Sequence, residues 1–163
     1  MPVNHLEQLI SEWLEYRGYF VKRNQKVGRR ARGGYDCEID VAAYHPETRH
    51  LVQYEPSTDT HSWAKRNARF RKKFAAGAAH IPGMFHGIQV PSTVDQHAVF
   101  LYGSTTNNST VGGGKILMVA DLLKEISADL ATKQIAKGIV PEQFALLRVL
   151  HLACEFRTSL FPK

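Results

Sequence analysis

The sequence is poor in cysteine and has no long apolar run. Its two cysteines, Cys37 and Cys154, form no CxxC pair and no cysteine/histidine ladder. This argues against a disulfide scaffold or a structural zinc site and favours a reducing, cytoplasmic setting. Residues 1–14 carry Glu7 and Glu12 between short apolar stretches, so we expect no signal peptide, no membrane span and no membrane partner.

Negative charge is also scarce. The 163 residues carry 15 Asp plus Glu against 21 Lys plus Arg, a net charge of +6, and 44% of them are hydrophobic. That length and composition suit one domain over residues 1–163 with a core of its own. The basic excess favours a polyanionic partner, and nucleic acid is the first candidate.

Apolar periodicity predicts an alternation of helices and strands. Helices are expected over residues 5–17, 62–79, 121–133 and 141–157, and strands over 19–21, 37–44, 50–56, 98–102 and 115–119. The basic, glycine-rich stretch 22–34 reads as a loop or an open hairpin. This order predicts an α/β fold, a three-layer sandwich whose mixed central β-sheet is flanked by helices, with its core over about residues 5–133.

Acidic residues concentrate where the two central strands are expected. Alternation along the second strand puts Gln53, Glu55 and Ser57 on one face, and Asp40 of the first strand is expected beside Glu55. Two carboxylates placed in this way suit Mg²⁺ or Mn²⁺, which take one or two carboxylates and several waters around a phosphate.

Order and spacing together resemble the PD-(D/E)xK superfamily of restriction-endonuclease-like nucleases, particularly its Holliday-junction-resolvase-like branch. The residues that carry the resemblance are LEQL (6–9), LEYRGY (14–19), EID (38–40) and LVQYE (51–55). The resemblance implies a restriction-endonuclease-like fold in which Asp40 and Glu55 bind metal. It further implies that Glu7 positions water or metal and that the Pro56 carbonyl completes the protein's coordination sphere.

The sequence departs from the family pattern at Ser57, because the family has lysine two positions after the glutamate. A hydroxyl cannot supply the positive charge that stabilises a phosphate in the transition state. Related folds sometimes supply the cation from the following helix, where Lys65 and Arg69 lie four residues apart on one face. Lys65 is the expected replacement, since lysine titrates and arginine effectively does not.

Each acid also has a plainer interpretation. Glu7 alone would be a solvated helix residue. Asp40 lies among apolar neighbours and needs either a cationic partner or a metal. Glu55 could instead form an ion pair with Arg49 or Lys65.

Two basic segments are candidates for contact with a phosphate backbone. The residues expected to bind nucleic acid are Lys22, Arg23, Lys26, Arg29, Arg30, Arg32, Arg69 and Lys72. The alternatives are a solvated loop for the first six and an ordinary polar helix face for the last two.

The sequence thus predicts a Mg²⁺- or Mn²⁺-dependent DNA endonuclease or resolvase-like phosphodiesterase acting on duplex or branched DNA, with Glu7, Asp40, Glu55 and Lys65 as catalytic residues. The alternative is a catalytically inactive protein of the same fold that serves as a nucleic-acid-binding module or as a subunit of a complex. A resolvase-like role would favour a homodimer, since a junction presents paired strands for cutting.

Overall fold

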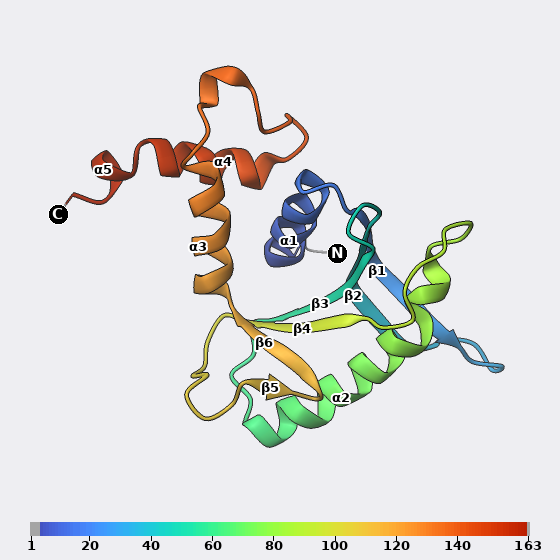
Figure 1. The fold of residues 1–163 in the computed structure, drawn as a ribbon. Coiled ribbons are helices and arrows are strands. Elements are labelled where there is room, and N and C mark those ends of the chain that lie inside the picture. Colours follow the sequence, from blue (N-terminus) through green and yellow to red (C-terminus); the bar gives the residue numbers. More distant parts are fainter. Residues whose placement is uncertain (1–3, 163) are drawn as a thin grey trace.

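The computed structural model describes residues 4–162. Its elements are α1 (His5–Tyr16), β1 (Phe20–Arg29), β2 (Tyr35–His45), β3 (His50–Ser57), α2 (Trp63–His80), η1 (Pro82–Met84), β4 (Asp95–Phe100), β5 (Thr110–Val111), β6 (Gly114–Met118), α3 (Val119–Leu130), η2 (Ile135–Lys137), α4 (Ala145–Glu155) and α5 (Arg157–Leu160). Figure 1 shows α1, α3 and α4 on one side of the sheet and α2 on the other.

The six strands form one sheet in the order β1-β2-β3-β4-β6-β5. The pairs β1/β2, β2/β3 and β5/β6 are antiparallel, whereas β3/β4 and β4/β6 are parallel. A mixed sheet with helices on both faces confirms the expected three-layer α/β fold.

Apolar side chains cover both faces of this sheet. On one face, residues of α1, α3 and α4 such as Trp13, Ile126 and Leu147 pack against Val41 and Val52. On the other face, α2 and the residues after it pack against the sheet in two smaller clusters, and these contain Phe70, Phe74, Ile81, Leu51 and Phe100. The two α2-side clusters leave polar groups between them, and the candidate site is built from these groups.

The expected hairpin is confirmed as β2 and β3, and of the two alternatives for residues 22–34 the loop is wrong, whereas the open hairpin agrees with β1 turning back into β2. Residues 20–29 form the ten-residue strand β1, which pairs with β2 along its length. Only the turn that follows is irregular. Its cations hid the strand pattern, yet lysine and arginine are what an edge strand uses to discourage pairing with other chains.

The β1–β2 ribbon changes its orientation where it leaves the sheet. Val21 packs in the α1-side cluster and Val27 in the α2-side cluster, although an even separation would put both on one face of a regular strand. Between them Asn24 has a positive φ of 53°. The β1–β2 ladder skips Asn24 and Asp40, which lie between the pairs Arg23/Val41 and Gln25/Ile39, and pairing of β2 with β3 begins only at Val41. Asp40 therefore lies where β2 separates from β3.

The helices lie close to their expected positions, with one difference at the last. α4 begins at Ala145 rather than at Pro141, because its first turn is held by α1. The buried carboxylate of Glu12 accepts hydrogen bonds from the backbone N–H groups of Leu146 (2.9 Å) and Leu147 (3.0 Å), which caps the helix. Among residues 4–162, no helix combines the length and apolar composition needed to cross a bilayer.

A candidate active site between two strands and α2

Asp40 and Glu55 lie side by side on β2 and β3, as their alternation predicts. The backbone N–H of Asp40 donates to Glu55 Oε1 at 3.3 Å. The Glu55 side chain thus accepts the hydrogen bond that a backbone carbonyl of β3 would accept if the ladder continued. Glu55 is fully buried, whereas the Asp40 side chain keeps 14% of its surface exposed. The pair therefore opens to solvent on the Asp40 side.

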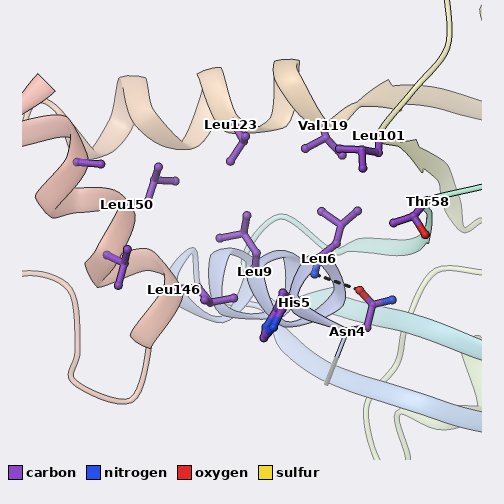
Figure 2. A pocket seen from close by; sticks show the side chains of 12 residues that line it. Asn4, His5, Leu6, Leu9, Thr58, Leu101, Val119, Leu123, Leu146 and Leu150 are labelled. Carbon is purple, nitrogen blue, oxygen red and sulfur yellow. Dashed lines mark hydrogen bonds between the residues drawn. The ribbon is translucent and has the colours of Figure 1, made fainter. Parts of the chain in front are cut away.

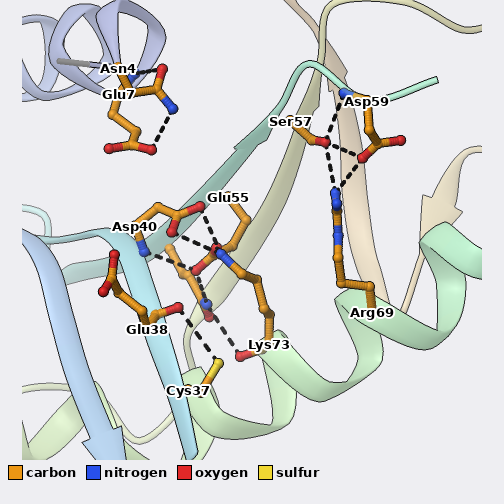
Figure 3. A network of polar contacts seen from close by, with 11 residues as sticks. Asn4, Glu7, Cys37, Glu38, Asp40, Glu55, Ser57, Asp59, Arg69 and Lys73 are labelled. Atoms are coloured by element: carbon orange, nitrogen blue, oxygen red, sulfur yellow. Dashed lines mark hydrogen bonds and ion pairs between the residues drawn. The ribbon is translucent and has the colours of Figure 1, made fainter. Parts of the chain in front are cut away.

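The cation at this pair is Lys73, from the middle of α2. Its Nζ donates to both carboxylate oxygens of Asp40 at 2.8 Å and forms an ion pair with Glu55 Oε2 (Figure 3). Lys65, the replacement expected from the sequence, is exposed and lies eight residues earlier on the same helix, about 12 Å along its axis. A cation of α2 does lie at the acids, but it is Lys73 and not Lys65, so the residue expected there is corrected.

Lys73 rather than Lys65 reaches the acids because of the way α2 lies along β3. Gly77 packs on Gln53, Lys73 reaches Glu55, and Arg69 donates to Ser57 at 2.7 Å. Four residues of helix advance about 6 Å and two residues of strand about 6.6 Å, so each helical step of four meets the next side chain on the β3 face. Lys65 continues this series past the end of the strand.

Burial controls the charges of the site. Desolvation, followed by repulsion from Asp40, raises the pKa of Glu55 to about 8, while the ammonium of Lys73 opposes the shift. Burial lowers the pKa of Lys73, but attraction to Glu55 and Asp40 outweighs burial and raises it above its usual value. Lys73 is thus a permanent cation at neutral pH, and the acid pair needs positive charge to stay ionised.

Glu7 belongs to α1, which approaches the pair from the other face of the sheet than α2 (Figure 1). Asn4 caps the helix by accepting from the N–H groups of Leu6 (3.1 Å) and Glu7 (3.4 Å), and its amide also donates to the Glu7 carboxylate. Burial, then repulsion from Asp40, raises the pKa of Glu7. The charges of Asp40 and Lys73 both act on Glu7, so three of the four expected catalytic residues share one electrostatic environment (Figure 3).

Sequence reasoning missed the buried amides that hold α2 on the sheet. Gln53 donates to Glu55 Oε1 at 2.8 Å and to the Lys73 carbonyl at 3.4 Å. Gln96 of β4 donates to Gln53 Oε1 and to the Phe74 carbonyl, both at 2.7 Å. The one available signal was the position of Gln53 two residues before Glu55, on the same strand face.

Ser57, where the family has lysine, belongs to a second polar cluster beside the acids. Its hydroxyl donates to Asp59 and accepts from Arg69, and Arg69 also pairs with Asp59 at 2.6 Å. Burial opposes ionisation of Asp59, but hydrogen bonds from Ser57 and Arg66 outweigh it and hold the pKa of Asp59 well below its usual range. Arg66, itself buried, lies over the rings of Trp63 and Phe100.

The cations expected to bind nucleic acid lie on two elements. Lys22, Arg23, Lys26 and Arg29 belong to β1, Arg30 and Arg32 to the turn after it, and Arg69 and Lys72 to α2. Arg30 pairs with Asp36 at 2.6 Å, and Arg69 pairs with Asp59. Arg23, Lys26, Arg29, Arg32 and Lys72 are exposed, so their ammonium and guanidinium groups are open to a partner.

The residues fit a hard divalent cation. Asp40 and Glu55 supply two carboxylates, the number that Mg²⁺ commonly takes from protein, and the raised pKa of Glu55 marks a shortage of positive charge there. Within residues 4–162 there is no group of three or more His, Cys, Asp or Glu side chains with metal-binding geometry. Asp40 and Glu55 are the two side chains of the site that could hold such a cation.

Comparisons with protein-family models and with curated proteins gave no match. A solved structure described as "Crystal Structure of Protein of Unknown Function AF1548" aligns with 12% sequence identity and a TM-score of 0.48, over 94% of this chain and 97% of that one. That likeness is too distant to indicate what this chain does.

Proposed function

We propose that this protein is a metal-dependent DNA endonuclease or resolvase-like phosphodiesterase of the PD-(D/E)xK type. The observation that carries the proposal is the position of Lys73, whose Nζ touches Asp40 and Glu55 together. Those two acids and a lysine are the groups that the family resemblance requires. Here the lysine comes from α2, and serine stands at its usual place on the strand.

Each residue of the site has a role that its surroundings support. Asp40 and Glu55 would hold Mg²⁺ or Mn²⁺, which when bound supplies a nucleophilic water and neutralises phosphate charge. Lys73 stays protonated and presents its ammonium to the phosphate, where a fixed charge in a partly dry site stabilises the transition state. Glu7, whose pKa is raised by burial, would exchange a proton with the attacking water.

The proposed substrate is duplex or branched DNA. The exposed cations of β1 and α2 contact phosphates without reading bases, which positions the backbone and carries no sequence information. Both cysteines are free thiols, which suits the reducing cytoplasm proposed for the protein.

The test is a cleavage assay with supercoiled plasmid, linear duplex, single strands and a four-way junction, in Mg²⁺, Mn²⁺ or EDTA. We expect metal-dependent cutting that is lost in Asp40→Asn and falls at least about 100-fold in Lys73→Met, the scale of losing an electrostatic group at a reacting centre. Lys65→Met is the matched control because Lys65 is exposed on the same helix. Cutting by Asp40→Asn at the rate of the unmodified protein would refute the proposal.

A second function, a non-catalytic nucleic-acid-binding module, is favoured by one observation. Lys73 already forms ion pairs with both acids, and the Ser57 hydroxyl is engaged by Asp59 and Arg69, so each polar group of the cluster has a partner within the protein itself. On this view the protein binds DNA and cuts none of the substrates in any metal. Arg23→Ala with Lys26→Ala would then weaken binding, and Asp40→Asn would leave it unchanged.

A further inference from the structure

A continuous apolar stripe lies open on the last two helices. Val149, Leu152, Phe156 and Leu160 follow one another at helical spacing along α4 and into α5, and Phe161 comes next. All five are exposed, Val149 at 64% and Phe161 at 74% of their surface. Large apolar side chains that form one contiguous exposed patch mark a surface that another molecule covers.

An apolar groove adjoins this stripe. It has a volume of about 630 Å³ and lies between α1, α3 and α4, where Leu6, Leu9, Leu123 and Leu150 line it (Figure 2). Val149 belongs to both features, because it forms part of the groove wall. The stripe and the groove are therefore one surface, and its C-terminal end is the segment that Figure 1 shows leading away from the body.

We propose that a second copy of this chain covers this surface in a two-fold symmetric dimer. In this dimer the C-terminal end of the stripe, Phe156 to Phe161, enters the groove of the partner beside the partner's Val149, and the partner does the same in return. A two-fold interface requires one patch to complement itself. This patch does so, because it carries both the projecting side chains and the hollow that receives them.

The segment cannot fill its own groove. It continues from the end of α4, and Figure 1 shows α5 leading away from α1 and α3, whereas the groove is walled by residues of α4 from Leu146 to Ala153. Nucleic acid does not fit either, since among residues 4–162 no Lys or Arg lines the groove, and lysine and arginine supply most of the affinity for a phosphate backbone.

The area is sufficient for a stable pair. Phe156, Leu160 and Phe161 are more than half exposed, so they bring roughly 300–450 Å² of side chain per copy and cover a similar area of the partner. Two reciprocal contacts then bury about 1,200–1,800 Å² in all, the size of ordinary specific interfaces. This inference is independent of the proposed nuclease activity.

Sedimentation velocity of the full chain across micromolar concentrations tests the dimer. We expect a concentration-dependent monomer–dimer equilibrium whose Kd rises at least about 10-fold in Phe161→Asp and in Val149→Lys, a loss of about 1.4 kcal/mol. Both positions are exposed, so circular dichroism should show unchanged folding. Phe20→Asp, at a position on β1 that is also more than half exposed, is the control and should dimerise normally.

Mixing the two variants gives a sharper result. A heterodimer of Phe161→Asp with Val149→Lys keeps one apolar contact and gains an ion pair at the other, so the mixture should dimerise more tightly than either variant alone. A protein that is monomeric at every concentration would overturn the proposal, as would variants that dimerise like the unmodified chain. A monomer that floats with lipid vesicles would overturn it in favour of a membrane surface.

Discussion

Replacing Lys73 by methionine should destabilise the protein strongly, because it leaves buried acids without their cation. Removing one partner of a buried pair costs about 3–5 kcal/mol. The Lys73 and Asp40 side chains are 23% and 14% exposed, so solvent recovers part of that energy and we expect a loss of about 2–4 kcal/mol at pH 7. Lys65→Met, an exposed position, should change the stability by less than about 0.5 kcal/mol.

The loss should also depend on pH with a defined sign. The pKa of Glu55 is raised above its usual 4.5 to about 8, so between these values the folded state holds a proton that the unfolded state has released. Stability contributed by this group therefore falls as pH rises, by up to about 1.4 kcal/mol per pH unit, and levels off above pH 8. Without Lys73 the pKa of Glu55 rises further, and the fall continues above pH 8.

Urea unfolding at pH 7 and pH 9 measures both effects. The difference between the unmodified protein and Lys73→Met should grow by about 1 kcal/mol between those two values. Adding Asp40→Asn to Lys73→Met should recover part of the lost stability, because it removes a negative charge that no longer has a cationic partner. A loss at pH 7 as small as that of Lys65→Met, or one that is the same at pH 9, would show that the three groups are not coupled as described.

Three further predictions concern the surroundings of the site. Gly77→Ala should cost about 1–3 kcal/mol by thermal or urea unfolding, since a Cβ there would lie 1.8 Å from Gln53 Oε1, whereas Gly83→Ala meets nothing within 4 Å and should be neutral. Glu12→Ala should cost about 1–2 kcal/mol and expose the start of α4 to amide hydrogen exchange, because it uncaps two N–H groups; unchanged exchange there would contradict the cap. Mg²⁺ affinity measured by calorimetry should rise from pH 7 to pH 9 as Glu55 ionises near its pKa of about 8, and Glu55→Gln should bind weakly at both values; a flat profile in the unmodified protein would exclude Glu55 as a ligand.

The sequence was sufficient to predict the pair of acids, because strand alternation is a local property. A side-chain period of two puts Gln53, Glu55 and Ser57 on one face whatever surrounds the strand, and the structure shows all three facing α2. Local patterns also predicted the β2–β3 hairpin and the three layers. They left a loop and an open hairpin as alternatives for residues 22–34, because the cations of β1 resemble a solvated loop until the pairing with β2 is known.

The identity of the cation was decided by tertiary structure alone. Lys65, Arg69 and Lys73 are spaced four apart on one face of α2, and nothing local says how far the helix is displaced along β3. The close packing of Gly77 on Gln53 and the hydrogen bonds from Gln53 and Gln96 to α2 carbonyls determine that displacement. These contacts join residues about 20 or more positions apart, so they arise only when the sheet and helix pack together, and they place Lys73 at the acids.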